Sequence, residues 1–287
     1  MERVSIMKYF LSFLLTVVSL FACTNQEPEV NPAQSKVHYD LGIELAQYSL
    51  YQNSLEEFAL AIKLDPSNVK AYRKKGLVHF GLKQYEEAEK LFKKTIALDP
   101  QNVQAHINMG MINYSKGNKD EARKLWEYAI NIKSNDNDAK AFNNIANLDK
   151  EEKQYDKAIE YYKLAVKNDP KNTMYINNLA DVWRLKGEPD QAIENLKKSL
   201  KLNARGMATH FNLGMAYKDL KEYEKAIESF KQSLKVNIAL TEAHYRIAQI
   251  KMLQKNRDSA LDSIESAIKS APTNLMYQKF RNKILGS

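Results

Sequence analysis

The residues best suited to covalent or metal chemistry are few, and the single cysteine is the most informative of them. Cys23 is the only cysteine among 287 residues, which excludes an internal disulfide framework, a cysteine-rich zinc site and a CxxC redox pair. The sequence has no GxSxG, P-loop, Rossmann or HExxH motif. Asp136 and Asp138 are spaced like the start of a calcium loop, but residues 139–141 (AKA) follow where further oxygen ligands are needed. We therefore expect no catalytic residue, no metal and no cofactor.

Cys23 follows a segment with the pattern of a secretory signal. Arg3 and Lys8 precede residues 9–22, a stretch of 14 residues without a charge. A membrane-spanning helix needs about 20 apolar residues, whereas the apolar region of a signal peptide is shorter. No later stretch is long and apolar enough to cross a bilayer. The pattern predicts an export signal over residues 1–22.

The end of this segment, Leu20-Phe21-Ala22-Cys23, resembles the lipobox of bacterial lipoproteins. The resemblance implies that the Cys23 thiol receives a diacylglyceryl group and that the signal is removed before it. Phe21 departs from the pattern, which more often has Ala, Ser or Thr there. The alternative is an incidental thiol beside an ordinary cleavage site. Residues 23–34 are polar and contain two prolines, so we expect a lipid-anchored tether on a membrane of the bacterial cell envelope.

The rest of the chain repeats one pattern with a period of 34 residues. Gly42, Gly76 and Gly110 are 34 residues apart, and an insertion of two residues near 134–138 accounts for the later offsets. Position 8 of each repeat is Gly or Ala, position 20 is small, and position 24 is large and apolar or aromatic. This period and these columns resemble the tetratricopeptide repeat family. The resemblance implies an all-α, right-handed superhelical solenoid of seven helix pairs.

The register fixes the expected boundaries of the solenoid. The seven repeats are expected at about 35–68, 69–102, 103–138, 139–172, 173–206, 207–240 and 241–274, followed by a capping helix at 275–287 with Met276, Phe280 and Ile284 on its packing face. One helix pair cannot bury its own apolar face, so stability comes from stacking and the ends need caps. All five histidines occupy packing positions and are interpreted as structural: His38, His106, His210 and His244 at position 4, and His79 at position 11.

The family resemblance places the binding site in a groove lined by the first helix, helix A, of each pair. Position 6 is asparagine in four consecutive repeats, at Asn108, Asn144, Asn178 and Asn212. An asparagine side chain both donates and accepts, and such a column resembles the asparagine ladders of peptide-binding tetratricopeptide grooves. Positive charge and an aromatic surface complete the predicted site: Arg73, Lys140, Arg184 and Tyr245. The alternative is that asparagine is common at position 6 of the family without a binding role.

Two other binding modes are disfavoured. Arg73, Asn108 and Lys140 fill three positions of a carboxylate clamp of this family, but Leu77 and Asn144 occupy the other two, so we do not expect a clamp. The net charge is +8, and Lys and Glu are interspersed along the helices. Such a mixed, solvated surface in an exported protein predicts no nucleic-acid partner.

These observations favour a non-catalytic scaffold that binds a peptide segment of an envelope protein. The resemblance extends to lipoproteins that assist pilus or outer-membrane assembly. An accessory subunit that binds a lipid or small solute for a transport system is the alternative, and a deep apolar pocket would favour it. A regulator of an enzyme is a more distant third.

Overall fold

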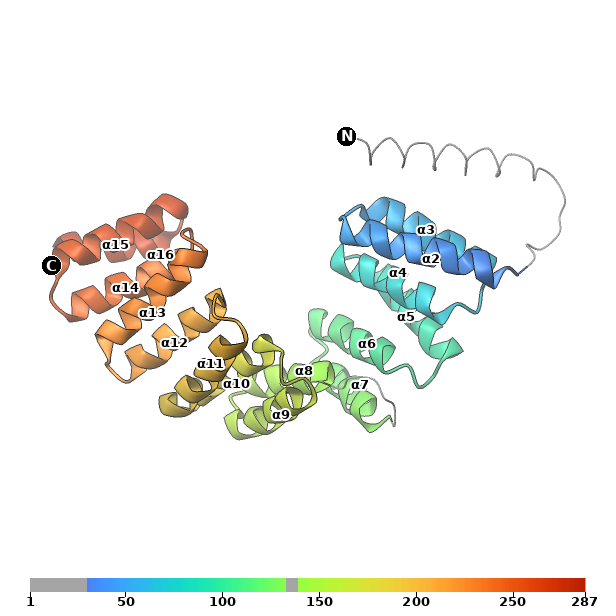
Figure 1. Ribbon diagram of the computed structural model, residues 1–287, viewed down its shortest axis with the longest axis horizontal. Helices are drawn as coiled ribbons and strands as arrows, with labels where there is room; N and C mark the ends of the chain where they lie inside the picture. The colour runs from blue at the N-terminus through green and yellow to red at the C-terminus, as the bar shows by residue number, and fades with distance from the viewer. Residues whose placement is uncertain (1–29, 133–138, 287) are drawn as a thin grey trace. The chain divides into compact units, whose positions relative to one another are not determined.

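The computed structural model describes residues 30–132 and 139–286, and it is all-α over these ranges, as predicted (Figure 1). The predicted signal, Cys23, Asp136 and Asp138 lie outside the described residues. The fifteen described helices are α2 (Pro32–Gln47), α3 (Tyr51–Leu64), α4 (Val69–Gly81), α5 (Tyr85–Leu98), α6 (Val103–Ser115), α7 (Lys119–Asn131), α8 (Ala139–Glu151), α9 (Tyr155–Asn168), α10 (Thr173–Lys186), α11 (Pro189–Leu202), α12 (Met207–Asp219), α13 (Tyr223–Val236), α14 (Thr241–Leu253), α15 (Arg257–Ser270) and α16 (Leu275–Gly286).

These helices form seven antiparallel pairs, from α2–α3 to α14–α15, followed by α16. Helix A of each repeat is the even-numbered member and helix B the odd-numbered one. Residues up to Asp99 and residues from Pro100 form two compact units. In the first, α3 packs on α4; in the second, each helix B from α7 to α15 packs on the even-numbered helix that follows it. Each unit therefore builds its core by stacking pairs, as repeat proteins must.

The two helices of a pair approach most closely where position 8 faces position 24. A Cβ added to Gly42, Gly76 or Gly214 would lie within 2.8 Å of the ring of Phe58, Phe92 or Phe230, and Gly110 faces Trp126 in the same way. Where position 8 is alanine, position 24 is Tyr162, Leu196 or Ile264. Glycine thus faces every Phe or Trp at position 24, whereas Ala146 accommodates the ring of Tyr162.

The turn between helices A and B has one backbone requirement that recurs in every repeat. The residue at position 15 has a positive φ in all seven turns, and only two of the seven are glycine: Ser49, Lys83, Gly117, Lys153, Gly187, Lys221 and Lys255. The left-handed conformation costs a non-glycine residue about 1 kcal/mol. Packing of the two helices therefore imposes this turn even where the local sequence opposes it.

Three position-4 histidines hold the loop that joins one repeat to the next. The Nε2 atoms of His106, His210 and His244 lie 2.9, 2.9 and 3.1 Å from the backbone carbonyl six residues earlier. In the first repeat, His38 instead contacts Glu57 at 2.6 Å. These contacts support the structural interpretation of position 4. Within residues 30–132 and 139–286, no group of three or more His, Cys, Asp or Glu could hold a metal ion.

Helix α16 caps the second unit, but with a different face from the one predicted. Tyr277 and Ile284 are buried, whereas Met276 is 46% exposed. Tyr277 and Phe280 each lie 5.2 Å from the ring of Tyr245. The packing face therefore runs through Tyr277, Phe280 and Ile284, and the expectation for Met276 was wrong. No helix among the described residues is long and apolar enough to span a membrane.

We expect Gly214→Ala to lower the free energy of unfolding by roughly 1–3 kcal/mol, because the new Cβ overpacks against Phe230. The double variant Gly214→Ala with Phe230→Leu reproduces the Ala180–Leu196 combination and should recover part of the loss. Gly81→Ala is the matched control, since nothing lies within 4 Å of its added Cβ. Urea unfolding followed by circular dichroism measures all three, and equal effects of Gly214→Ala and Gly81→Ala would contradict the steric argument.

Candidate peptide-binding face

The candidate site is the face of the second unit formed by successive A helices. Helices α10 and α12 contact each other directly, although α11 separates them in sequence. Side chains at positions 5, 6, 9, 12 and 13 of α8, α10 and α12 also bond across from one A helix to the next. We call this surface the A-helix face, and it is the described counterpart of the predicted groove.

An ionic ladder crosses the A-helix face. Lys150 on α8 lies 3.3 Å from Asp181 on α10, and Arg184 one turn further along α10 lies 3.1 Å from the same carboxylate. Arg184 also donates to Asp219 on α12 at 3.0 Å. The four side chains are 18–32% exposed. The ladder therefore ties three consecutive repeats together in a partly desolvated environment.

Arg184 was predicted to add positive charge to this face, and in the ladder it is paired with two aspartates. Burial disfavours its charged form, but the hydrogen bond to Asp219 and the charge of Asp181 outweigh burial and raise the pKa of the guanidinium. Two carboxylates thus neutralise Arg184. Its role on this face is to join repeats, and a ligand anion would have to compete with both aspartates.

The predicted asparagines differ in what they bond. Asn178 donates to Asn143 of the preceding repeat at 2.8 Å. Asn144 and Asn212 are partly exposed, and the described part of the chain offers their amides no hydrogen bond. Asn108 is 7% exposed and its Nδ2 is buried without a partner. Asn144 and Asn212 are therefore the amides that remain accessible to a ligand.

Position 5 carries two further asparagines that bond between repeats. Asn143 accepts from Asn178, and Asn177 bonds in both directions with the hydroxyl of Thr209 at 3.0–3.1 Å. Asn143 and Asn177 are not among the residues predicted for the site. The dipeptide Asn-Asn occurs at 143–144 and again at 177–178, one period of 34 residues later. This recurrence was the sequence feature that could have predicted a second column of asparagines.

The remaining predicted residues do not all meet on this face. Lys140 is exposed and has no ion pair among the described residues, so its charge is available. Arg73 belongs to α4 in the first unit, where it lowers the pKa of Tyr39 against the larger, raising effect of burial. Tyr245 is 9% exposed beneath α16, which places it in the core and not on the surface where it was predicted.

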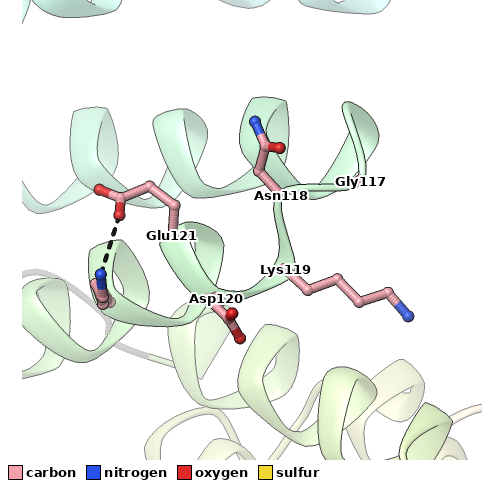
Figure 2. A pocket seen from close by; sticks show the side chains of 6 residues that line it. Gly117, Asn118, Lys119, Asp120 and Glu121 are labelled. Atoms are coloured by element: carbon pink, nitrogen blue, oxygen red, sulfur yellow. Dashed lines mark hydrogen bonds and ion pairs between the residues drawn. The ribbon is translucent and has the colours of Figure 1, made fainter.

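A surface hollow of about 450 Å³ lies elsewhere, at the turn between α6 and α7 (Figure 2). Its lining is polar and charged: Gly117, Asn118, Lys119, Asp120, Glu121 and Lys124. The Lys124 ammonium lies 3.5 Å from Glu121 within it. An apolar solute would gain little from such a lining. This hollow gives no support to a lipid-binding role.

Comparisons with known families identify the repeats. Four profiles described as tetratricopeptide repeat match residues 39–103, 79–142, 139–172 with 241–274, and 208–237. Together these matches cover most of the chain. A comparison with curated proteins finds no significant match.

Solved structures share the fold at low sequence identity. The chain is similar to the hetero-tetramer Cut9–Hcn1 of APC/C, with a TM-score of 0.68 and 20% identity over 88% of this chain, and it spans only 48% of that chain. It is also similar to PilW, a type IV pilus biogenesis factor, with a TM-score of 0.66 and 19% identity over 77% of this chain and 99% of that one. A third similar structure is that of Pseudomonas aeruginosa PilF. It has a TM-score of 0.64 and 21% identity, over 76% of this chain and 98% of that one.

We expect Arg184→Met to lower the free energy of unfolding by about 1 kcal/mol, because it removes two partly exposed ion pairs and leaves Asp219 without its partner. Lys218→Met is the matched control, since it makes the same change of charge on α12 without breaking an ion pair. Urea unfolding at low and high salt measures the difference. The ladder would not contribute to stability if the loss of unfolding free energy in Arg184→Met did not depend on salt, or if both variants lost the same amount.

Proposed function

Because this chain belongs to the tetratricopeptide repeat family, we propose that it is an exported, membrane-anchored lipoprotein that acts as a non-catalytic scaffold. Its A-helix face holds an extended peptide segment of an envelope protein. The anchor is the lipidated Cys23. The predicted tether of residues 23–34 is shortened to residues 23–31, because α2 already begins at Pro32.

The observation that carries the peptide-binding proposal is the pair of free amides on the A-helix face. Asn144 on α8 and Asn212 on α12 have the same register position, and their neighbours Asn143, Asn177 and Asn178 are held in place by bonds between repeats. A free amide can accept from a peptide N–H and donate to a peptide carbonyl. The fixed spacing of equivalent positions favours a ligand whose own groups recur regularly, as those of an extended backbone do.

The charges of the A-helix face limit further which ligands would fit it. Lys150 and Arg184 are neutralised by Asp181 and Asp219, so the middle of the face offers little net charge. Lys140 at one side and Lys218 at the other have no ion pair among the described residues. A segment with a polar or neutral centre and an acidic residue near an end would fit this distribution.

Fold similarity to PilW, a type IV pilus biogenesis factor, supports a role in assembling an envelope structure. The similarity is one of fold at 19% identity, so the proposal names the class of role and not the partner. The lipobox-like sequence at Cys23 supports the same placement, because a scaffold for envelope assembly works at a membrane surface.

We expect Asn144→Ala with Asn212→Ala to reduce partner capture about tenfold or more, since each lost amide bond to the ligand contributes roughly 1 kcal/mol and leaves a ligand group unpaired. Capture is measured by photocrosslinking in cells from position 140, with mass spectrometry of the crosslinked partner. Helix content should not change, because neither amide bonds within the repeats.

The matched control is Asn131→Ala with Asn168→Ala. These amides bond carbonyls of their own B helices, away from the A-helix face, so capture should stay at the wild-type level. If the control reduces capture as much as the test variant, or if neither does, the A-helix face is not the binding site.

We expect Cys23→Ser to move the protein from the membrane fraction to the soluble fraction, because two or more acyl chains supply the stable attachment. Fractionation after a high-salt wash and metabolic labelling with a fatty acid measure the anchor. Unlabelled wild-type protein, or a Cys23→Ser variant that remains in the washed membranes, would overturn lipidation while leaving the peptide-binding proposal intact.

A further inference from the structure

The ends of three consecutive B helices carry exposed lysines in equivalent positions. Position 29 is Lys167 on α9, Lys201 on α11 and Lys235 on α13, and all three are exposed. The connecting loops add Lys171 and Arg205 at position 33. Within residues 139–286 none of these five side chains has an ion pair. Their charges are therefore fully available to an outside partner.

Helix stability does not account for this accumulation. Position 25, one turn earlier, is also lysine in the same helices, at Lys163, Lys197 and Lys231. Two lysines at i and i+4 repel each other, and the favourable interaction with the helix C-terminus needs only one of them. The equivalent pairs in the first three repeats are Ala59 with Lys63, Lys93 with Ala97 and Glu127 with Asn131. The doubled lysines are thus particular to repeats 4–6.

Large aliphatic side chains are exposed beside these lysines. Leu202 follows Lys201, Val236 follows Lys235, and Ile238 occupies the next loop, with 48, 49 and 79% of their surfaces exposed. They stand at positions 30 and 32, so they occupy the same end of the B helices as the lysines. Nothing in this end of the unit covers them. We call the five cations and these three aliphatic residues the basic edge.

The acidic residues of the same helices lie at their other ends. Positions 18 and 22 are acidic in all three: Asp156, Glu160, Asp190, Glu194, Glu224 and Glu228. Seven residues of helix separate position 22 from position 29, which is about 10 Å. That exceeds the screening length of about 8 Å at physiological ionic strength. The connecting loops carry one carboxylate, Asp169 between Lys167 and Lys171, and it accepts a hydrogen bond from Asn172 at 3.1 Å.

We propose that the basic edge docks on an anionic lipid surface, with the lysines against headgroups and Leu202, Val236 and Ile238 inserted between them. Lysines combined with exposed aliphatic residues are the chemistry of interfacial membrane binding. Binding of single-stranded nucleic acid instead uses aromatic side chains for stacking, and the basic edge has none. This inference is independent of the lipid anchor and of the A-helix face, and it fixes which end of the B helices is turned to the membrane.

The charge test uses full-length protein with Cys23→Ser, so that no acyl chain contributes to binding. Binding is measured to vesicles of phosphatidylcholine alone and to anionic vesicles that also contain phosphatidylglycerol. Residues 1–22 are common to all variants. Lys167→Gln with Lys201→Gln and Lys235→Gln should weaken binding to the anionic vesicles at least about tenfold and reduce its salt dependence. The matched control, Lys36→Gln with Lys63→Gln and Lys94→Gln, removes three exposed lysines without ion pairs elsewhere and should change binding little.

The insertion test places an environment-sensitive dye on a new cysteine in the same background. The dye at Ile238→Cys should shift its emission to shorter wavelength on anionic vesicles, whereas the dye at Asp190→Cys, at the opposite end of α11, should not. The proposal is overturned if both variants of the charge test lose binding equally, if neither does, or if only position 190 shifts. Loss of binding to an acidic protein or to polyphosphate, with vesicle binding unchanged, would assign the edge to another polyanion.

Discussion

One steric contact recurs in every repeat, the contact of position 8 of helix A with the side chain at position 24 of helix B. In one repeat the smallest residue, Gly214, faces a large ring, Phe230. In another, the larger Ala180 stands opposite the smaller Leu196. Because protein interiors are close-packed, a small residue at position 8 is needed for helix B to approach the helix A backbone here. The contact recurs in each pair, and within each unit the pairs stack on one another to build the core.

The two faces of the stack follow from that regularity. A helices of neighbouring repeats are near enough to exchange side-chain bonds, and the A-helix face uses them: Lys150, Asp181, Arg184 and Asp219 neutralise one another across α8, α10 and α12. At the ends of α9, α11 and α13 the described residues offer no such ion pair, and Lys167, Lys201 and Lys235 keep their charges. The same fold therefore presents a nearly neutral surface rich in amides and, on other helices, a surface of like charge.

The sequence predicted what depends on the period and left open what depends on contacts between repeats. The columns at positions 8, 20 and 24 predicted the helix pairs because small and large residues recur every 34 residues. The asparagine column was equally visible, but whether an amide is free depends on its neighbour. Asn178 bonds with Asn143, whereas Asn144 finds no hydrogen-bond partner in residues 30–132 and 139–286. Tyr245 was misplaced because the capping helix, which has no following repeat, covers it with Tyr277 and Phe280.

The left-handed residue at position 15 of every A–B turn has a consequence for how the protein can change. Five of the seven turns carry Ser or Lys where glycine would be relaxed, and each such residue stores about 1 kcal/mol of backbone strain. The strained residues are Ser49, Lys83, Lys153, Lys221 and Lys255. The turns belong neither to the A-helix face nor to the basic edge, so the chain holds a reserve of stability that substitutions could release without altering either surface. Substitutions at the turns could therefore offset the stability lost when residues of a binding surface are replaced.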